Sequence, residues 1–372
     1  MRVTLPASRT LPVLTLILAI STCAVTITPP ATDGATYQSS ESRTSALTRA
    51  LSWLSSNKPA NGSYGPFSQV QAAPAAYALW LNDSSSAKAR ATFTWLASEL
   101  DDETSGLWAF PEADIPGEIL YTLSLTNNLA LLAQDSTSYQ LLLDLQQPDG
   151  GFKGFYDDDG NQITTSVDTA MALWGLKHAQ RIPGANQSAA VNFLLTLQNP
   201  DGSFNLAPAI ASNQYAALGP EPVSMTALVI LVLKDVSYTD SDPSVSRALG
   251  YLSQAVAVNF TGHVYAAVLS ALAFKAFGRS ADASKAVSFI LSNQNDDGGF
   301  RDVIRSSEGS NALDTGWASI ALQLVQPEPL RSPALNPLVL TVLVASVAVP
   351  VVAILGAVVF FHRRKRKVLT PA

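Results

Sequence analysis

The chain has 372 residues, 47% of them hydrophobic and 14% charged, so it can bury a large core and is not a disordered chain. Its formal charge of −6 conceals an asymmetry, because two arginines lie at the start and five cations lie together near the end. Without these seven charges the remainder carries −13, which argues against nucleic acid as a partner. The one cysteine, Cys23, falls in the leader, so the rest of the chain has no disulfide or cysteine metal ligand.

Residues 1–30 have the pattern of a signal peptide. Arg2 and Arg9 precede an apolar run from Leu11 to Ile27, which is followed by Pro29-Pro30. The alternative is an uncleaved anchor, because the run is long and its cleavage site is poorly defined. Residues 31–43 then form a short lead-in to the body.

The other end of the chain predicts a membrane anchor. Residues 338–361 are apolar and uncharged, and a helix of this length measures about 36 Å, enough to cross a hydrocarbon core of ~30 Å. The basic tail 362–372 follows at once and predicts a cytoplasmic C-terminus by the positive-inside rule. We therefore expect a single-pass protein of the cell membrane, with an extracellular body joined to its anchor by a Pro-rich stalk at 326–337.

The body contains an internal repeat, marked by a turn with two small residues and an aromatic one. Its three clearest copies end at Phe152, Phe204 and Phe300, in Gln-Gln-Pro-Asp-Gly-Gly-Phe, Gln-Asn-Pro-Asp-Gly-Ser-Phe and Gln-Asn-Asp-Asp-Gly-Gly-Phe. The glycines supply the positive φ that ends a helix, and the aromatic can fold back against the hairpin end. Each turn is expected to join two helices: 139–146 to 166–179, 189–198 to 223–236, and 283–294 to 312–325.

Three weaker copies follow the same template. They predict helix pairs at 46–56 and 73–81, at 87–100 and 118–132, and at 245–256 and 263–277. The body at 44–325 would then hold six hairpins and twelve helices. Closure of these hairpins into a two-layered ring would remove the end repeats that an open solenoid must cap.

This repeat resembles that of the protein prenyltransferase β subunits and the squalene and oxidosqualene cyclases, over nearly the whole body. The resemblance implies an all-α toroid of six helical hairpins in two concentric layers, with a ligand cavity inside the inner layer. The catalytic motifs of these families are not intact. The prenyltransferase zinc site needs a cysteine, and the cyclase Asp-x-Asp-Asp motif is absent, although Ser-Val-Asp168-Thr-Ala is similar to its end. We expect neither a metal nor a cofactor.

Alignment of the six expected inner helices selects two levels of candidate site residues. Near the helix starts we consider Glu118, Asp168, Asp314 and His263 as candidate catalytic groups. About one turn later, candidate ligand-binding aromatics fall at Tyr77, Tyr121 and Trp317. If this face looks inward, the ring has an acidic mouth above an aromatic throat. Equally, acids at helix N-termini are favoured as caps, and buried aromatics are common core residues.

Three functions remain open at this stage. The first is a cell-surface protein that binds an extracellular lipid, glycan or protein in its cavity or at its rim. The second is an enzyme that acts on an isoprenoid or another lipid, with Asp168 or Asp314 as the acid. The third is a carbohydrate-active enzyme, which needs two carboxylates ~5–10 Å apart across a polar cleft.

Overall fold

The computed structural model describes residues 40–57, 64, 68–109, 111–156, 161–208, 222–305 and 309–325. The expected signal peptide, stalk, membrane helix at 338–361 and basic tail lie outside these residues. Within the described part, no helix has the length and apolar character that a membrane crossing requires. The described part is mostly helical, as predicted.

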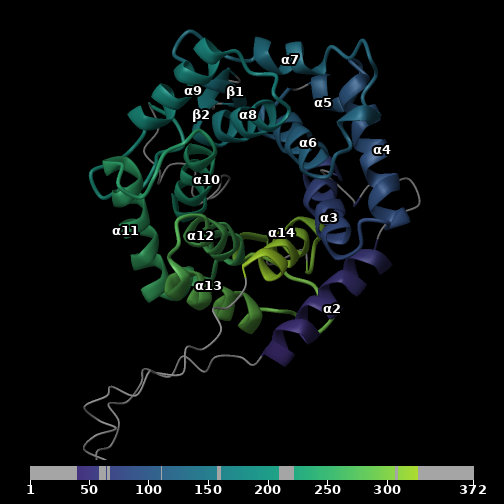
Figure 1. Cartoon of the computed structure of the whole chain (residues 1–372), viewed down its shortest axis with the longest axis vertical. Helices are drawn as coiled ribbons and strands as arrows, with labels where there is room; N and C mark the ends of the chain where they lie inside the picture. Colours follow the sequence, from purple (N-terminus) through teal and green to yellow (C-terminus); the bar gives the residue numbers. More distant parts are fainter. Residues whose placement is uncertain are drawn as a thin grey trace, which may run out of the picture.

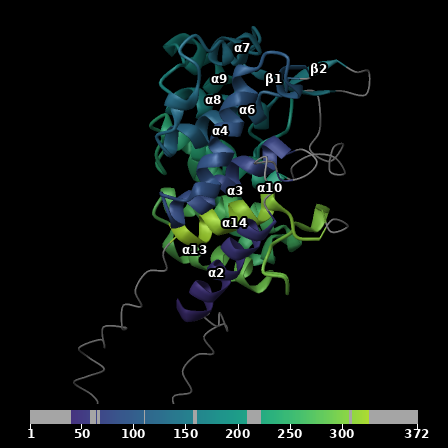
Figure 2. The ribbon, with the colours of Figure 1, turned by 90° about the vertical axis from the view of Figure 1, so that its right-hand side faces the viewer.

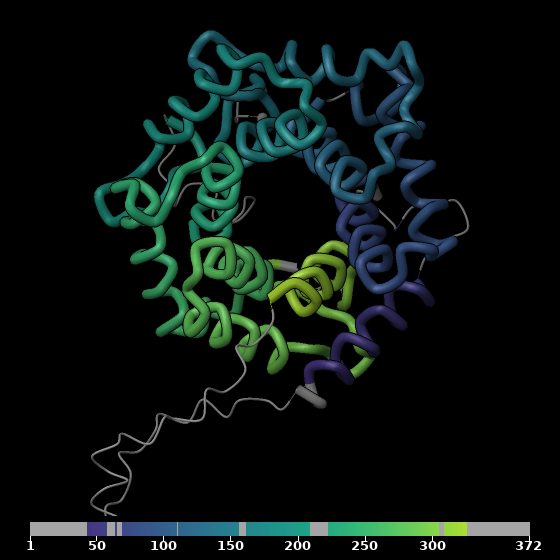
Figure 3. The backbone as a smooth tube through the Cα atoms, viewed as in Figure 1, coloured from purple at the N-terminus to yellow at the C-terminus, as the bar shows by residue number. Residues whose placement is uncertain are grey.

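Six helices form a closed inner ring, which Figures 1 and 3 show end-on. Each of them contacts the next one in chain order, and the last contacts the first. These inner helices are α3 (Ser68–Asn82), α6 (Asp114–Leu125), α8 (Ser166–His178), α10 (Pro222–Asp235), α12 (Val264–Ala276) and α14 (Ala312–Leu324).

A second layer of helices surrounds this ring (Figure 1). Its members alternate with the inner helices along the chain, as the hairpin repeat predicted. They are α2 (Ser40–Ser56), α4 (Ala87–Asp101), α7 (Ser138–Asp144), α9 (Gly184–Thr196), α11 (Pro243–Ala257) and α13 (Ser280–Ser292). Short helices complete the connections: α5 (Gly106–Ala109), η1 (Leu129–Leu131), η2 (Asn259–Gly262) and η3 (Val303–Arg305).

Two details differ from the sequence prediction. The inner helix expected at 118–132 starts earlier and ends at Leu125, because Asn127 adopts a positive φ of 57° that stops the helix. A small hairpin, β1 (Phe152–Tyr156) with β2 (Gln162–Thr165), replaces part of one loop. Phe152 pairs with Thr165 in its antiparallel register. Viewed edge-on in Figure 2, this hairpin lies at one face of the ring, just before the start of α8.

The three strong turn motifs form one repeated structure. The first glycine of each has a φ between 92° and 97°, and the aromatic that follows is fully buried. The N–H of each aromatic donates to the hydroxyl of an inner-helix threonine at 2.9–3.1 Å. These pairs are Phe152 with Thr169, Phe204 with Thr226, and Phe300 with Thr315. The motif therefore anchors each outer-to-inner turn onto the helix that follows it.

Small residues let the inner helices approach closely. The closest approach is between α6 and α8, where a Cβ added at Gly117 would lie 2.4 Å from the carbonyl oxygen of Met171. One at Gly175 would lie 2.2 Å from the carbonyl oxygen of Gly117. The inner helices also bury one small residue each at an equivalent position: Ala78, Thr122, Ala172, Ala227, Ala267 and Ala318.

The first and last helices close the ring. The α2 helix packs against both α14 and α3, and α14 packs against α3. Arg43, near the start of α2, donates through Nε to the carbonyl oxygen of Leu322 at 2.9 Å. From the end of α13, Gln294 Nε2 donates to the carbonyl oxygen of Ala46 at 2.8 Å. The two ends of the described body therefore lie side by side.

Candidate functional site

A cavity of about 230 Å³ lies inside the ring, in the half that contains the C-terminal ends of the inner helices. All six inner helices contribute to its wall. The wall is mainly apolar and aromatic, and its few polar side chains come from the last turns of α8, α10 and α12. The lining residues are Tyr77, Tyr121, Trp174, His178, Leu231, Lys234, Asp235, Leu272, Lys275, Ala276, Trp317, Ile320 and Leu324.

Tyr77, Tyr121 and Trp317 line this cavity from three inner helices that are neighbours in the ring, α3, α6 and α14. The structure thus brings the three predicted ligand-binding aromatics into one cavity. The ring of Tyr121 stacks on Trp174 with centroids 3.9 Å apart. Burial raises the pKa of both tyrosine hydroxyls above their ordinary value, so they are neutral hydrogen-bonding groups.

Glu118 lies behind this aromatic level. Its Oε1 accepts a hydrogen bond of 3.0 Å from Nε1 of Trp317, and only 5% of the residue is exposed. The bond joins α6 to α14, which both contact α3. Burial raises the pKa of Glu118 to about 8, although the hydrogen bond from Trp317 opposes the shift. Near neutral pH the cavity therefore has a protonated carboxyl beneath its aromatic floor.

The mouth of the cavity combines two lysines with one engaged carboxylate. Lys234 and Lys275 are exposed and sit in the last turns of α10 and α12. Asp235 accepts hydrogen bonds from the indole N–H of Trp174 and from Nε2 of His178, the latter at 2.8 Å. Lys234 and Lys275 outnumber Asp235, the one carboxylate among the lining residues, so the lysines and this carboxylate together carry a net positive charge.

Asp168, in the first turn of α8, has a buried carboxylate that ties three elements together. Its Oδ2 accepts from the hydroxyl of Thr165 at 2.5 Å, and its Oδ1 accepts from the backbone N–H of Asp114 at 3.2 Å. A Cβ added at Gly154 of β1 would lie 1.7 Å from Asp168 Oδ1, so the hairpin backbone packs directly on the carboxylate. Burial raises the pKa of Asp168 to about 6, although the hydrogen bonds from Thr165 and Asp114 lower it.

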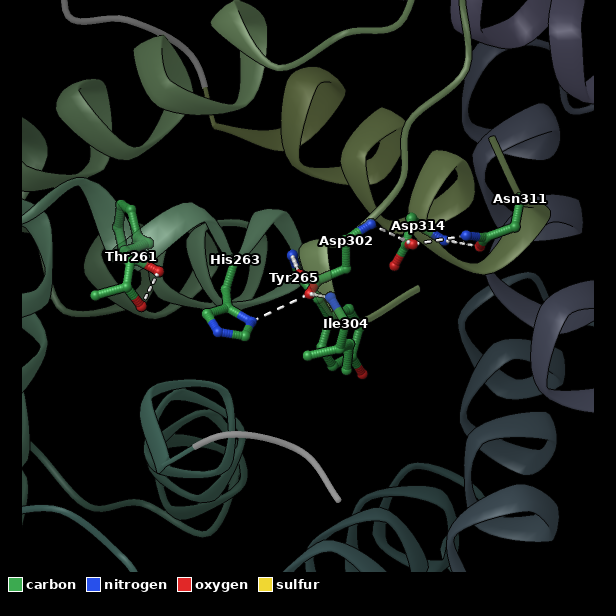
Figure 4. A network of polar contacts seen from close by, with 8 residues as sticks. Thr261, His263, Tyr265, Asp302, Ile304, Asn311 and Asp314 are labelled. Atoms are coloured by element: carbon green, nitrogen blue, oxygen red, sulfur yellow. Dashed lines mark hydrogen bonds and ion pairs between the residues drawn. The ribbon is translucent and has the colours of Figure 1, made fainter. Parts of the chain in front are cut away.

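Asp314 and His263 join a second network at the starts of α14 and α12 (Figure 4). Asp314 Oδ2 accepts from the side chain of Asn311 and from the backbone N–H of Asp302, both at 2.7 Å. Asp302 Oδ1 lies 3.1 Å from Nδ1 of His263, and its Oδ2 accepts from the N–H of Tyr265 at 2.8 Å. Burial alone would raise the pKa of Asp302, but the hydrogen bonds from His263 and the backbone hold it below its usual value.

The three acids expected at the mouth of the ring are buried in the structure. Glu118, Asp168 and Asp314 are at most 5% exposed, because each is held by hydrogen bonds within the fold. None of the three lines the cavity described above, which opens at the opposite ends of the inner helices. Whether they and His263 act in catalysis stays a prediction. In the described part of the chain, no cluster of three or more His, Cys, Asp or Glu side chains is arranged to hold a metal.

The polar residues of the mouth were not among the predicted site residues: Trp174, His178, Lys234, Asp235 and Lys275. The lysines had a usable signal, because cations recur in the last turns of consecutive inner helices. That signal was ambiguous, since a cation in the last turn is also favoured by the helix dipole. The contact of Asp235 with two α8 side chains depends on the packing of α8 against α10 and has no sequence signature.

Comparisons with known proteins agree on the fold. The family model of the A-macroglobulin TED domain matches residues 122–299. A protein from Actinoplanes of known structure is 17% identical with a TM-score of 0.57, over 76% of this chain and 98% of that one. The type II terpene cyclase MstE from Scytonema, in its apo form, is 12% identical with a TM-score of 0.55, over 76% and 97%. No curated protein sequence matches.

A further structure of the Scytonema cyclase, a substituted form in complex with the substrate geranylgeranyl dihydroxybenzoate, is 11% identical with a TM-score of 0.52. It covers 76% of this chain and 97% of that chain. At these identities the likeness concerns the fold alone. The resemblance to the prenyltransferase and squalene-cyclase superfamily of α/α toroids is thus confirmed at the level of the fold.

Proposed function

We propose that this toroid is the extracellular part of a membrane-anchored binding protein, and that its cavity holds a small apolar or aromatic group bearing a negative charge. One observation carries the proposal: an aromatic chamber whose mouth is lined by Lys234 and Lys275. An apolar wall favours an apolar body, and a few placed polar groups at the mouth fix its orientation. The signal peptide at 1–30 and the anchor at 338–361 supply the proposed location.

The size of the cavity limits what it can take. Its 230 Å³ exceeds the ~150 Å³ of an engineered apolar cavity that holds benzene, and lies below the ~300 Å³ at which drug-sized pockets begin. The ligand, or the part of it that enters, is therefore a single ring or a short branched chain. A polycyclic isoprenoid product does not fit this volume.

The charges at the mouth select the sign of the polar group. Lys234 Nζ lies 5.1 Å from the centroid of the Phe277 ring, which places the ammonium group beside an apolar surface. Asp235 is engaged by Trp174 and His178, so neither lysine is neutralised by an ion pair with it in the described residues. A carboxylate or phosphate at the mouth would thus meet two available cations.

The test uses the full chain in lipid nanodiscs and two probes, phenylbutyrate and the neutral phenylbutanamide, with affinities measured by calorimetry. Phenylbutyrate should bind about tenfold more tightly than the amide, since a charge-assisted contact contributes about 1.5 kcal/mol. The double variant Lys234→Gln, Lys275→Gln should bring the acid down to the affinity of the amide. The matched control Lys285→Gln, on the outer helix α13, should change neither value. Equal affinities for acid and amide in the unsubstituted protein would refute the proposal.

An enzyme that acts on an isoprenoid is the second candidate. It is favoured by the likeness to a type II terpene cyclase fold and by the protonated carboxyl of Glu118 behind the cavity floor. Acid strength counts against it, because a carboxyl with a pKa of about 8 is a weaker proton donor than an ordinary one. Turnover of an isoprenoid by the unsubstituted chain, abolished in Glu118→Gln, would establish this candidate over simple binding. Turnover lost instead in Asp168→Asn or Asp314→Asn would restore the acids first considered.

A carbohydrate-active enzyme is the least favoured of the three. Among its described lining residues the cavity has one carboxylate, Asp235, whereas glycoside hydrolysis needs a pair separated by ~5–10 Å. The mainly apolar wall also offers few hydrogen bonds to sugar hydroxyls. A reducing-sugar assay on common glycans should therefore give no activity above background.

A further inference from the structure

We infer that the mouth of the cavity faces the membrane and that the face around it docks on an anionic lipid surface. The inference rests on the proposed function, because it takes the anchor at 338–361 as given. It adds the orientation of the ring and the source of the ligand.

The chain leaves the ring at the mouth. Leu324 lines the cavity, and Val325, the next residue, is the last one of the body before the stalk. The start of α2 lies at the same place, because Arg43 donates to the carbonyl oxygen of Leu322. The hairpin β1–β2 precedes the start of α8 and therefore marks the opposite face (Figure 2). The anchor is thus attached at the edge of the mouth and not at the hairpin face.

The stalk is too short to hold the mouth far from the lipid. Residues 326–337 span at most about 40 Å when fully extended, and Pro-rich segments do not exceed this reach. An inner helix of 13 residues adds about 20 Å between the two faces. The mouth is therefore always within reach of the bilayer, and the charges on the two faces decide which one rests on it.

The mouth face carries a balanced set of charges on an otherwise acidic protein. The last helical turns and the connections after α3, α6, α8, α10 and α12 contain as many cations as acids. The cations are Lys177, Arg181, Lys234, Lys275 and Arg279, and the acids are Asp83, Asp135, Asp235, Asp240 and Asp242. The excess negative charge of the body must therefore lie elsewhere, and Lys234 and Lys275 border the cavity itself.

The opposite face presents more acids than cations to solvent in the described residues. Each of the three strong turn motifs places an exposed aspartate between an outer helix and the start of an inner one, at Asp149, Asp201 and Asp297. An anionic lipid surface repels these turns and attracts the lysines of the mouth. Such a surface repels the acidic face more strongly than the charge-balanced mouth face, which favours a ring that lies flat on the bilayer, mouth downward.

This orientation identifies where the ligand comes from. A molecule with an apolar body and a negative group partitions into the surface of a membrane. With the mouth against that surface, such a molecule passes from the lipid into the aromatic chamber without crossing open water. The occupant of the docking face is the lipid surface, and the occupant of the cavity is an amphiphile drawn from it.

The experiment places a fluorophore at either end of one outer helix, α11, in the full chain with Cys23→Ser. One label is attached through Ser241→Cys, because Ser241 is exposed in the turn before α11, on the mouth side. The other is attached through Val258→Cys, because Val258 directly follows α11 on the opposite side and is 60% exposed. The proteins are placed in nanodiscs whose lipid headgroups carry a nitroxide quencher. About a third of the lipid is anionic in one set and none in the other.

We expect at least twofold stronger quenching at position 241 than at position 258 in anionic nanodiscs, and a smaller difference in neutral ones. In the double variant Lys234→Gln, Lys275→Gln, the difference in quenching between the two positions in anionic nanodiscs should fall to the difference seen in neutral nanodiscs. Equal quenching at the two positions, or stronger quenching at 258, overturns the orientation. Calorimetry with phenylbutyrate separates a failure of the orientation from a failure of the proposed function. If phenylbutyrate binds but the quenching is equal at the two positions, only the orientation is refuted. Position-selective quenching without binding refutes only the ligand class.

Discussion

Glu118 offers a measurable consequence of burying a carboxyl beneath an aromatic floor. Its pKa is raised from 4.5 to about 8, so the folded protein keeps a proton that the unfolded chain releases. Because the folded state binds more protons across this interval, the free energy of unfolding falls as pH rises through it. From about pH 5 to about pH 7.5 the loss from this one group amounts to about 3 kcal/mol.

Substitution of Glu118 by glutamine removes the titration and keeps an oxygen that can accept from Trp317 Nε1. We expect Glu118→Gln to match the unsubstituted protein near pH 5 and to exceed its stability by about 3 kcal/mol near pH 7.5. Urea unfolding of the full chain in detergent, followed by circular dichroism across this pH range, measures the difference. Glu103→Gln, at an exposed position, is the control and should leave the pH profile unchanged. Parallel pH profiles for Glu118→Gln and the unsubstituted protein would refute a protonated Glu118 beneath the aromatic residues of the cavity.

Two further predictions concern close approaches of the backbone. Gly117→Ala should destabilise the fold by about 3 kcal/mol or more, because its Cβ would overlap a backbone carbonyl of α8. Gly250→Ala, where a Cβ on α11 would meet no other atom, should stabilise the fold by about 0.5–1 kcal/mol. A thermal melt of both variants decides this, and equal melting temperatures would contradict the packing of α6 on α8. Gly154→Ala should separate the β1–β2 hairpin from Asp168, with faster amide hydrogen exchange in the hairpin, while unchanged exchange would mean that the carboxylate is not held there.

The inner layer was predictable because its turns have a strong chemical signature. A glycine with positive φ, a buried aromatic and a threonine acceptor recur at Phe152, Phe204 and Phe300. They mark where three of the six inner helices begin, α8, α10 and α14. The alignment then placed Tyr77, Tyr121 and Trp317 at one level, because helices that start together keep a common register. The hairpin β1–β2 had no such signature, since its short strands depend on contacts with α6 and α8.

The direction in which the cavity opens was not predictable. Asp168 and Asp314 lie at the helix starts whether they support a cap or face a ligand. The structure decides between the two, because each carboxylate accepts a hydrogen bond from the N-cap residue of its helix, Thr165 or Asn311. Similarly, the sequence places Asp235 at the end of a helix but does not reveal that Trp174 and His178 reach it from α8. These distinctions depend on side-chain packing between neighbouring helices and not on periodicity.

Closure of the ring between its first and last helices has a consequence for how the chain folds. Arg43 and Leu322 are 279 residues apart, so the seam at α2 and α14 forms only after the last hairpin has been made. Contacts of such long separation carry a large loop-closure cost and are expected late in folding. During synthesis the apolar face of α2 that packs on α14 therefore stays exposed until α14 has been made, and a chaperone would recognise such a face. Once closed, the ring lacks a terminal repeat that can fray alone, which favours slow, all-or-none unfolding that begins at this seam.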